Sequence, residues 1–245
     1  MVQQYYMKKI TGIIFALFIF ILFAVKESHA NGTPGIIGEV ILLEGKAELF
    51  SFISGERFTI DEGTKIQIGQ TIRTSENTLL KIVLSDTTSL SLRESTSLAF
   101  YYLRNNNNDP PTRLKMEFGK LSIIQKKKYP NKTLELITPS AEISVVTAEF
   151  SVIAAETECL VLVHSGRVGL ASSSISIKEA YIGTKGEEIQ IKQNRAPSPP
   201  IIVPKNQWDS WLEQFIVTDR FRLIVRKNKD REIIDWIMRE RNADD

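Results

Sequence analysis

The sequence predicts a mainly β protein, an antiparallel sandwich or roll of short strands, followed by C-terminal α-helices. Apolar residues alternate with polar residues over much of residues 36–192, and a period of two is typical of strands with one buried face. Glycine, asparagine, aspartate and serine separate these runs at intervals that suit turns. After the proline-rich residues 196–204, apolar residues recur every three or four positions. That spacing predicts amphipathic helices.

The first half of the predicted β domain consists of alternating runs joined by short polar turns. Such pairs of runs predict hairpins or neighbouring strands. The paired runs are 38–43 with 47–49, 58–60 with 66–68, and 80–84 with 90–92, and the last pair flanks Ser85-Asp86-Thr87-Thr88. Residues 114–118 and 121–123 predict two further strands that turn at Gly119-Lys120.

Residues 134–170 form the most strand-like stretch of the chain. A first strand ends at Thr138-Pro139, because proline has no N–H to donate to a ladder. The apolar phase then changes between Val145 and Val146, which predicts a β-bulge that keeps one face buried. Residues 159–163 are apolar at every position and predict a central strand covered on both faces. His164-Ser165-Gly166-Arg167 predicts a turn, with Gly166 at positive φ.

The order of these pieces resembles the FecR-type extracytoplasmic domain, as a divergent member. The pieces are Thr138-Pro139, the bulged strand that ends in Glu149-Phe150, the Val-rich strand from Leu160 to Val163, and Gly166-Arg167-Val168. Family members usually have Arg-Gly-Thr where this chain has Val146-Thr147-Ala148. The earlier run Gly69 to Thr74 also resembles the family pattern. The resemblance covers about residues 36–192 and implies a bacterial β domain that acts outside the cytoplasm.

The N-terminus has the three parts of a secretory signal peptide. Lys8-Lys9 is basic, residues 10–25 are uncharged and mostly apolar, and Ser28-His29-Ala30 is a site for cleavage after Ala30. We therefore predict a signal peptide at 1–30 and a periplasmic or extracellular location. The alternative is an uncleaved N-terminal anchor, although a spanning helix needs about 20 apolar residues.

We expect four parts: a signal peptide at 1–30, a FecR-like β domain at 31–195, a Pro-rich linker at 196–204 and a helical segment at 205–245. Asn206 is the predicted N-cap of the first helix. Trp208, Trp211 and Trp236 belong to the helical segment. The helices could cap the β domain, or contact a partner or a membrane surface.

The balance of charges argues against one function class, nucleic-acid binding. The whole chain has 31 basic and 29 acidic residues, and without residues 1–30 the balance is 28 to 28. Nucleic-acid binding usually needs a basic excess, so we predict none.

Lys126 to Lys128 with Tyr129 could form a basic contact site or a solvated turn. The single cysteine, Cys159, lies in the most apolar run and predicts a buried hydrophobe.

No residues are predicted to be catalytic, cofactor-binding or metal-binding. After residue 30, the only histidine is His164, and no second histidine or cysteine accompanies it at metal-ligand spacing. Four carboxylates, Asp86, Glu94, Glu142 and Glu149, could pair in space and leave an envelope hydrolase as a minor alternative. Asp86 sits in a turn, where aspartate forms local hydrogen bonds.

The predicted function is that of a non-enzymatic binding or scaffold module in the cell envelope. Its expected partner is an envelope protein or a glycan. The alternative is a signalling regulator of the iron-uptake type, which the FecR resemblance implies. Such regulators have a cytoplasmic sigma-factor-binding segment before the membrane span. Only residues 1–9 precede the apolar run here, which weakens that alternative.

Overall fold

The computed structural model describes residues 35–52, 54–104, 109–126, 134–217, 223–227 and 232–234. The chain divides into two units, residues 1–35 and 36–245, and the strands described below belong to the second. The predicted signal peptide lies outside the described residues, as do Lys127, Lys128, Tyr129 and Trp236. Among the described residues, no helix has the length and apolar character needed to cross a membrane.

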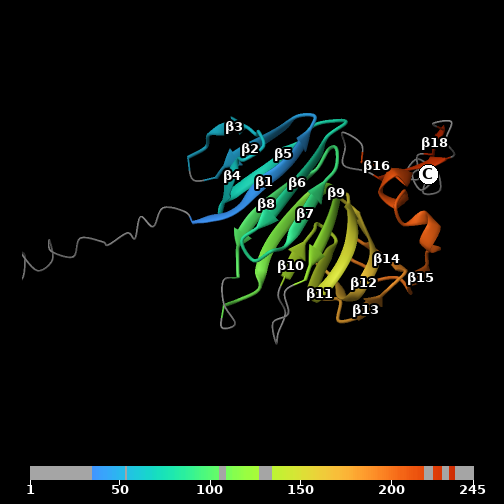
Figure 1. Cartoon of the computed structure of the whole chain (residues 1–245). Coiled ribbons are helices and arrows are strands. Elements are labelled where there is room, and N and C mark those ends of the chain that lie inside the picture. The colour runs from blue at the N-terminus through green and yellow to red at the C-terminus, as the bar shows by residue number, and fades with distance from the viewer. Residues whose placement is uncertain are drawn as a thin grey trace, which may run out of the picture. The chain divides into compact units, whose positions relative to one another are not determined.

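The described part of the chain is built mainly of strands (Figure 1). The first eight are β1 (Ile36–Glu44), β2 (Ala47–Ser51), β3 (Arg57–Thr59), β4 (Lys65–Gln67), β5 (Gln70–Thr74), β6 (Leu79–Leu84), β7 (Ser89–Leu92) and β8 (Ser97–Tyr102). The next seven are β9 (Thr112–Gln125), β10 (Leu134–Ile137), β11 (Ala141–Ala154), β12 (Glu158–Ser172), β13 (Ala180–Thr184), β14 (Glu187–Lys192) and β15 (Ile201–Ile202). The mainly β class predicted from the alternating pattern is confirmed.

β1 to β15 form one open, branched, 15-stranded sheet. The main path runs β15-β14-β12-β11-β10-β9-β7-β6-β1-β4, with β13 added beside β12 and the series β3-β2-β5-β8 joined to β9. β10 lies parallel to β9, and the other strand pairs of the described chain are antiparallel. The expected antiparallel sandwich or roll of short strands is therefore corrected to one open, mixed sheet.

Three long strands, β9, β11 and β12, cause this branching because each changes partners midway. Residues 112–118 of β9 pair with β8 and β10, whereas residues 119–125 pair with β7 and β11. Likewise, β12 pairs with β14 through residues 158–162 and with β13 through residues 167–171. The sheet therefore has two branches that share these long strands. The first branch is β3-β2-β5-β8-β9-β10-β11-β12-β13, and the second is β4-β1-β6-β7-β9-β11-β12-β14-β15.

Each long strand also changes the phase of its buried residues where it changes partners. In β11 the register shifts between Val145 and Ala148, and Val146 is left 44% exposed. This confirms the predicted bulge. β9 and β12 behave in the same way, at Gly119 (φ +116°) and Gly166 (φ +80°). The positive φ of Gly166 is confirmed, but the turns predicted at these glycines are wrong because both strands run straight through them.

Strand pairing corrects other local predictions. β1 and β2 do not form a hairpin with each other: β1 pairs with β4 and β6, and β2 pairs with β3 and β5. The hairpin of β6 and β7 around Ser85–Thr88 is confirmed. Between β12 and β13, residues 174–177 form a serine-rich turn, in which the N–H of Ile177 donates to the carbonyl of Ser174.

One large hydrophobic cluster is lined by strands from both branches of the sheet. Residues 159–163 are buried throughout, as predicted for a strand covered on both faces. Cys159, Val161 and Val163 point into the large cluster. Leu160 and Leu162 lie in a second cluster, which Trp211 completes.

The predicted C-terminal helices are wrong for the residues that the structure describes. Two short 3₁₀ turns, η1 (Lys205–Gln207) and η2 (Trp211–Gln214), are followed by a small sheet of β16 (Phe215–Val217), β17 (Leu223–Lys227) and β18 (Glu232–Ile234). Pro204, not Asn206, occupies the N-cap of η1, and no side chain caps it. The spacing of Trp208 and Trp211 fits a 3₁₀ turn, where residues i and i+3 align, and the β-branched residues that follow favour strands.

Candidate functional site

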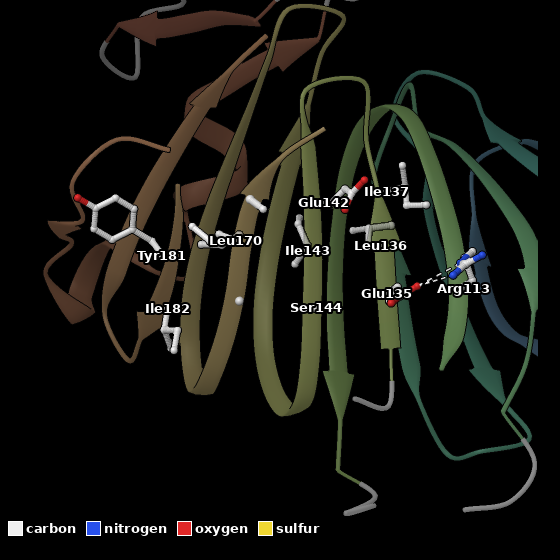
Figure 2. A pocket seen from close by; sticks show the side chains of 13 residues that line it. Arg113, Glu135, Leu136, Ile137, Glu142, Ile143, Ser144, Leu170, Tyr181 and Ile182 are labelled. Carbon is white, nitrogen blue, oxygen red and sulfur yellow. Dashed lines mark hydrogen bonds and ion pairs between the residues drawn. The ribbon is translucent and has the colours of Figure 1, made fainter. Parts of the chain in front are cut away.

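A groove of about 800 Å³ lies on the outer face of the sheet, over β9 to β13 (Figure 2). Strand register places its side chains in two rows across the strands, because directly paired residues share a face. The first row is Arg113, Glu135, Ser144, Gly169 and Ile182. The second row contains Ile137, Glu142, Ala171 and Ala180. We call this feature the outer groove.

The floor of the outer groove is formed by small residues. Ser144, Gly169, Ala171 and Ala180 lie on three adjacent strands. A Cβ on Gly169 would lie 2.6 Å from Oγ of Ser144, so any side chain there would displace the serine hydroxyl. The depth of the groove therefore depends on glycine at position 169.

The ends of the outer groove differ in chemistry. At one end Nε and Nη2 of Arg113 donate to the same oxygen, Oε2 of Glu135, at 3.1 and 2.8 Å. At the other end Ile182 is 55% exposed, and Figure 2 shows the two ends on opposite sides of the floor. The exposed carboxylate of Glu142 lies between them in the second row. The groove thus offers charged hydrogen-bonding groups and an apolar wall.

The four candidate carboxylates do not form a common site. Asp86 is buried in its turn, where it accepts from the N–H of Thr88 at 2.9 Å and the hydroxyl of Thr112 at 3.1 Å. This confirms its predicted local role. Glu142 lines the outer groove, whereas the other three candidates do not. Among the described residues, no three His, Cys, Asp or Glu side chains gather as a metal site.

Glu94 is instead part of an ion pair with a buried lysine. Its Oε1 lies 2.6 Å from Nζ of Lys120, whose side chain is 2% exposed. Burial alone would raise the pKa of Glu94, but the hydrogen bond and charge of Lys120 outweigh it and lower that pKa. This ionised pair ties the loop after β7 to β9 and has no visible substrate-binding role.

His164 and Glu149 lie near each other on the outer face of the second branch. Nε2 of His164 lies 2.8 Å from Oγ of Ser151, which lies 2.8 Å from Oγ of Ser122. The indole of Trp208 packs edge-on against the imidazole, with ring centres 5.6 Å apart. Burial lowers the pKa of His164, although Glu149 and Asp209 oppose that effect. The imidazole of His164 is therefore half-buried.

Residues 203–212 cover this face of the sheet. Nε1 of Trp208 donates to the carbonyl of Val203 at 2.9 Å, and Nε1 of Trp211 donates to Oε2 of Glu188 at 2.5 Å. Trp211 is 1% exposed and packs against Leu160 and Leu162. We call residues 203–212 the tryptophan cap. It is a cap of the kind that the sequence suggested, made from turns and not from a helix.

Sequence reasoning missed most of the outer groove, namely Arg113, Glu135, Ser144, Gly169 and Ile182. One signal was available: Gly169 and Ala171 occupy alternate, outward-facing positions of a strand whose inward positions are large. Small residues at alternate positions are consistent with a surface that something else approaches closely. Cys159, in contrast, is buried as predicted, and burial raises the pKa of its thiol to about 12.

Comparison with known proteins gives one family match. Residues 70–169 match the family model described as "FecR protein", a shorter range than the resemblance suggested. No curated protein matches the chain. Two crystal structures of a "putative anti-sigma factor" from Parabacteroides distasonis are similar to 61% of this chain at 16% identity. Their TM-scores are 0.49 and 0.48, and the similarity covers 67% and 68% of those chains. On the family match alone, residues 70–169 of this chain are a FecR domain.

Proposed function

We propose that this chain is a regulatory FecR-domain protein of the bacterial cell envelope, which acts by binding a partner and not by catalysis. The observation that supports this most is the FecR match, because its residues include the strands β9, β10 and β11 that form much of the outer groove. FecR resemblance implies signalling of the iron-uptake type. It therefore favours a regulator over a passive scaffold.

The chemistry of the outer groove supports a contact role. Small floor residues let another molecule approach the backbone closely, while Ile137 and Ile182 provide apolar contacts. Arg113, Glu135 and Glu142 can exchange hydrogen bonds with polar groups of a protein or a glycan. Proposed catalysis by paired carboxylates has less support, since Asp86 and Glu94 are held in structural hydrogen bonds elsewhere.

The proposed location is outside the cytoplasm, with residues 1–30 either removed after Ala30 or kept as an anchor. The balanced charge after residue 30 supports a protein or glycan partner over nucleic acid. Contact with the membrane surface would fall to Trp236 more than to Trp211, because Trp211 is buried in the tryptophan cap.

The test is site-specific photo-crosslinking in cells, with the probe at Ser144 on the groove floor. The matched control carries the probe at Glu156, in the exposed turn between β11 and β12. We expect a discrete crosslinked partner from position 144 and not from 156. Equal crosslinking from both positions, or none from 144, would contradict a contact role for the groove.

A second measurement separates a regulator from a scaffold. Transcription is compared between cells with and without the gene, in iron-limited and iron-rich medium. A regulator predicts that loss of the gene changes transcription of a defined set of genes, and that Glu142→Lys reproduces the change. Unchanged transcription together with a position-specific crosslink would support the scaffold instead.

A further inference from the structure

Among the residues that the structure describes, the main sheet has four terminal strands, and three of them are protected against pairing with another chain. Natural edges are protected by charged residues, proline or short length. β3 carries the exposed Arg57, and β4 carries Lys65, which forms an ion pair with Glu39. β15 has two residues and lies between Pro200 and Pro204. β13 is the remaining edge.

β13 lacks all three kinds of protection. Its sequence, Ala-Tyr-Ile-Gly-Thr, contains no charge and no proline. Within the described chain it is hydrogen-bonded along one side, to β12. Tyr181 is 38% exposed and Ile182 is 55% exposed. An exposed apolar edge of this kind is a template for adding a further strand.

The direction of the free backbone groups follows from one hydrogen bond. The N–H of Thr184 donates to Oε2 of Glu187 at 2.6 Å, so it points away from β12. Backbone groups repeat their direction every second residue along a strand. The N–H and C=O groups of Ala180 and Ile182 therefore face the open edge.

We propose that β13 pairs with β13 of a second copy of this chain, antiparallel, about a two-fold axis between the two Tyr181 residues. Ala180 then lies opposite Ile182 of the partner subunit, and Ile182 lies opposite the partner's Ala180. Both residues have outward-facing backbone groups, so these two pairs can exchange four N–H···O=C bonds. Such an interface is isologous, as expected of a two-fold dimer.

Charge complementarity favours a second copy as the occupant. The same register places Lys178 opposite Thr184 of the partner subunit, where the partner's Glu187 carboxylate binds the Thr184 N–H. Lys178 is exposed and carries the opposite charge, and symmetry provides the contact twice. A register centred on Ile182 instead would need the N–H of Thr184, which Glu187 already occupies.

Aromatic pairing favours the same register. The two Tyr181 residues meet on the axis as a non-hydrogen-bonded pair, in which Cα atoms are about 4.5 Å apart and side chains are close. The pairing would also continue the first row of the outer groove, which ends at Ile182, into the partner's Ala180. The two grooves would become one continuous surface. This dimer does not depend on the proposed regulatory function.

The first test is the oligomeric state of the full chain, measured by analytical ultracentrifugation over a wide concentration range. We expect a monomer–dimer equilibrium. Tyr181→Asp places like charges opposite each other and should weaken the dimer about tenfold or more. Ile201→Asp, at an exposed residue of the β15 edge, is the matched control and should leave the dimer unchanged.

A mixing experiment keeps this test valid if single variants lose stability. Tyr181→Asp and Tyr181→Lys chains should each be mostly monomeric, while an equal mixture should form heterodimers because opposite charges meet on the axis. A wild-type chain that stays monomeric at every concentration would overturn the proposal. So would a dimer that Tyr181→Asp leaves intact.

Cysteine crosslinking tests the register. Cα atoms about 4.5 Å apart lie within the range that a disulfide spans, so Tyr181→Cys should form a covalent dimer under mild oxidation. Thr184→Cys should not, because three residues separate it from the axis in each copy. The native Cys159 is buried and does not interfere. Equal crosslinking of both variants, or crosslinking of Thr184→Cys alone, would refute this pairing.

Discussion

Gly119 is the residue at which β9 passes from one branch of the sheet to the other, and replacing it should destabilise the whole domain. Its φ of +116° is one that residues with a side chain rarely adopt. A Cβ there would also contact the backbone of Thr96 and lie 2.6 Å from the Cβ of Thr96. The Thr96 hydroxyl links the residue before β8 to β9: it donates to the carbonyl of Lys120 at 3.1 Å and accepts from the Lys120 N–H at 2.9 Å.

The cost of Gly119→Ala has two parts. A strained backbone conformation costs about 1–3 kcal/mol, and forcing extra atoms into a packed interior costs about 1–3 kcal/mol. The free energy of unfolding should therefore fall by about 2–6 kcal/mol. In a domain of this size, 1 kcal/mol corresponds to a Tm change of about 2–4 °C, so Tm should fall by about 5–20 °C.

The assay is urea unfolding followed by circular dichroism, with Gly63→Ala as the matched control. Gly63 also has positive φ, +85°, but a Cβ there would meet no atom within 4 Å. The control therefore carries the conformational cost without the clash. If Gly119→Ala lost no more stability than Gly63→Ala, the close approach of Thr96 to β9 would not be the constraint that we infer.

Three further outcomes follow from the second hydrophobic cluster and the core. Trp211→Ala should release the tryptophan cap, because a buried tryptophan contributes about 3–5 kcal/mol; faster tryptic cleavage after Lys205 would show this, and unchanged cleavage would contradict it. Burial lowers the pKa of His164 below its usual 6.5, so its contribution to stability should be complete above that pH and decline as pH falls through the lowered pKa. Urea midpoints from neutral to mildly acidic pH should show a decline that His164→Gln reduces. The Cys159 thiol, with a pKa of about 12, should stay protonated and react with a thiol reagent no faster than the domain opens; rapid reaction of native protein would refute its burial.

The sequence by itself determined the class of the fold and several local features. Alternation of apolar residues revealed the strands, since burial of one face repeats every second residue. The phase change at Val145 and Val146 located a real bulge, and the uniformly apolar residues 159–163 located the strand covered on both faces. These features are local, so neighbouring residues are enough to predict them.

Only the tertiary structure decided which strands pair, and with them the outer groove and the open edge. Glycine often marks a turn between strands. Gly119 and Gly166 instead lie inside continuous strands, where their neighbours across the sheet hold them. Arg113 meets Glu135 because β10 is parallel to β9. Local periodicity contains no information about partners so far apart in the chain, and the same limit made turns and strands after Pro204 look like helices.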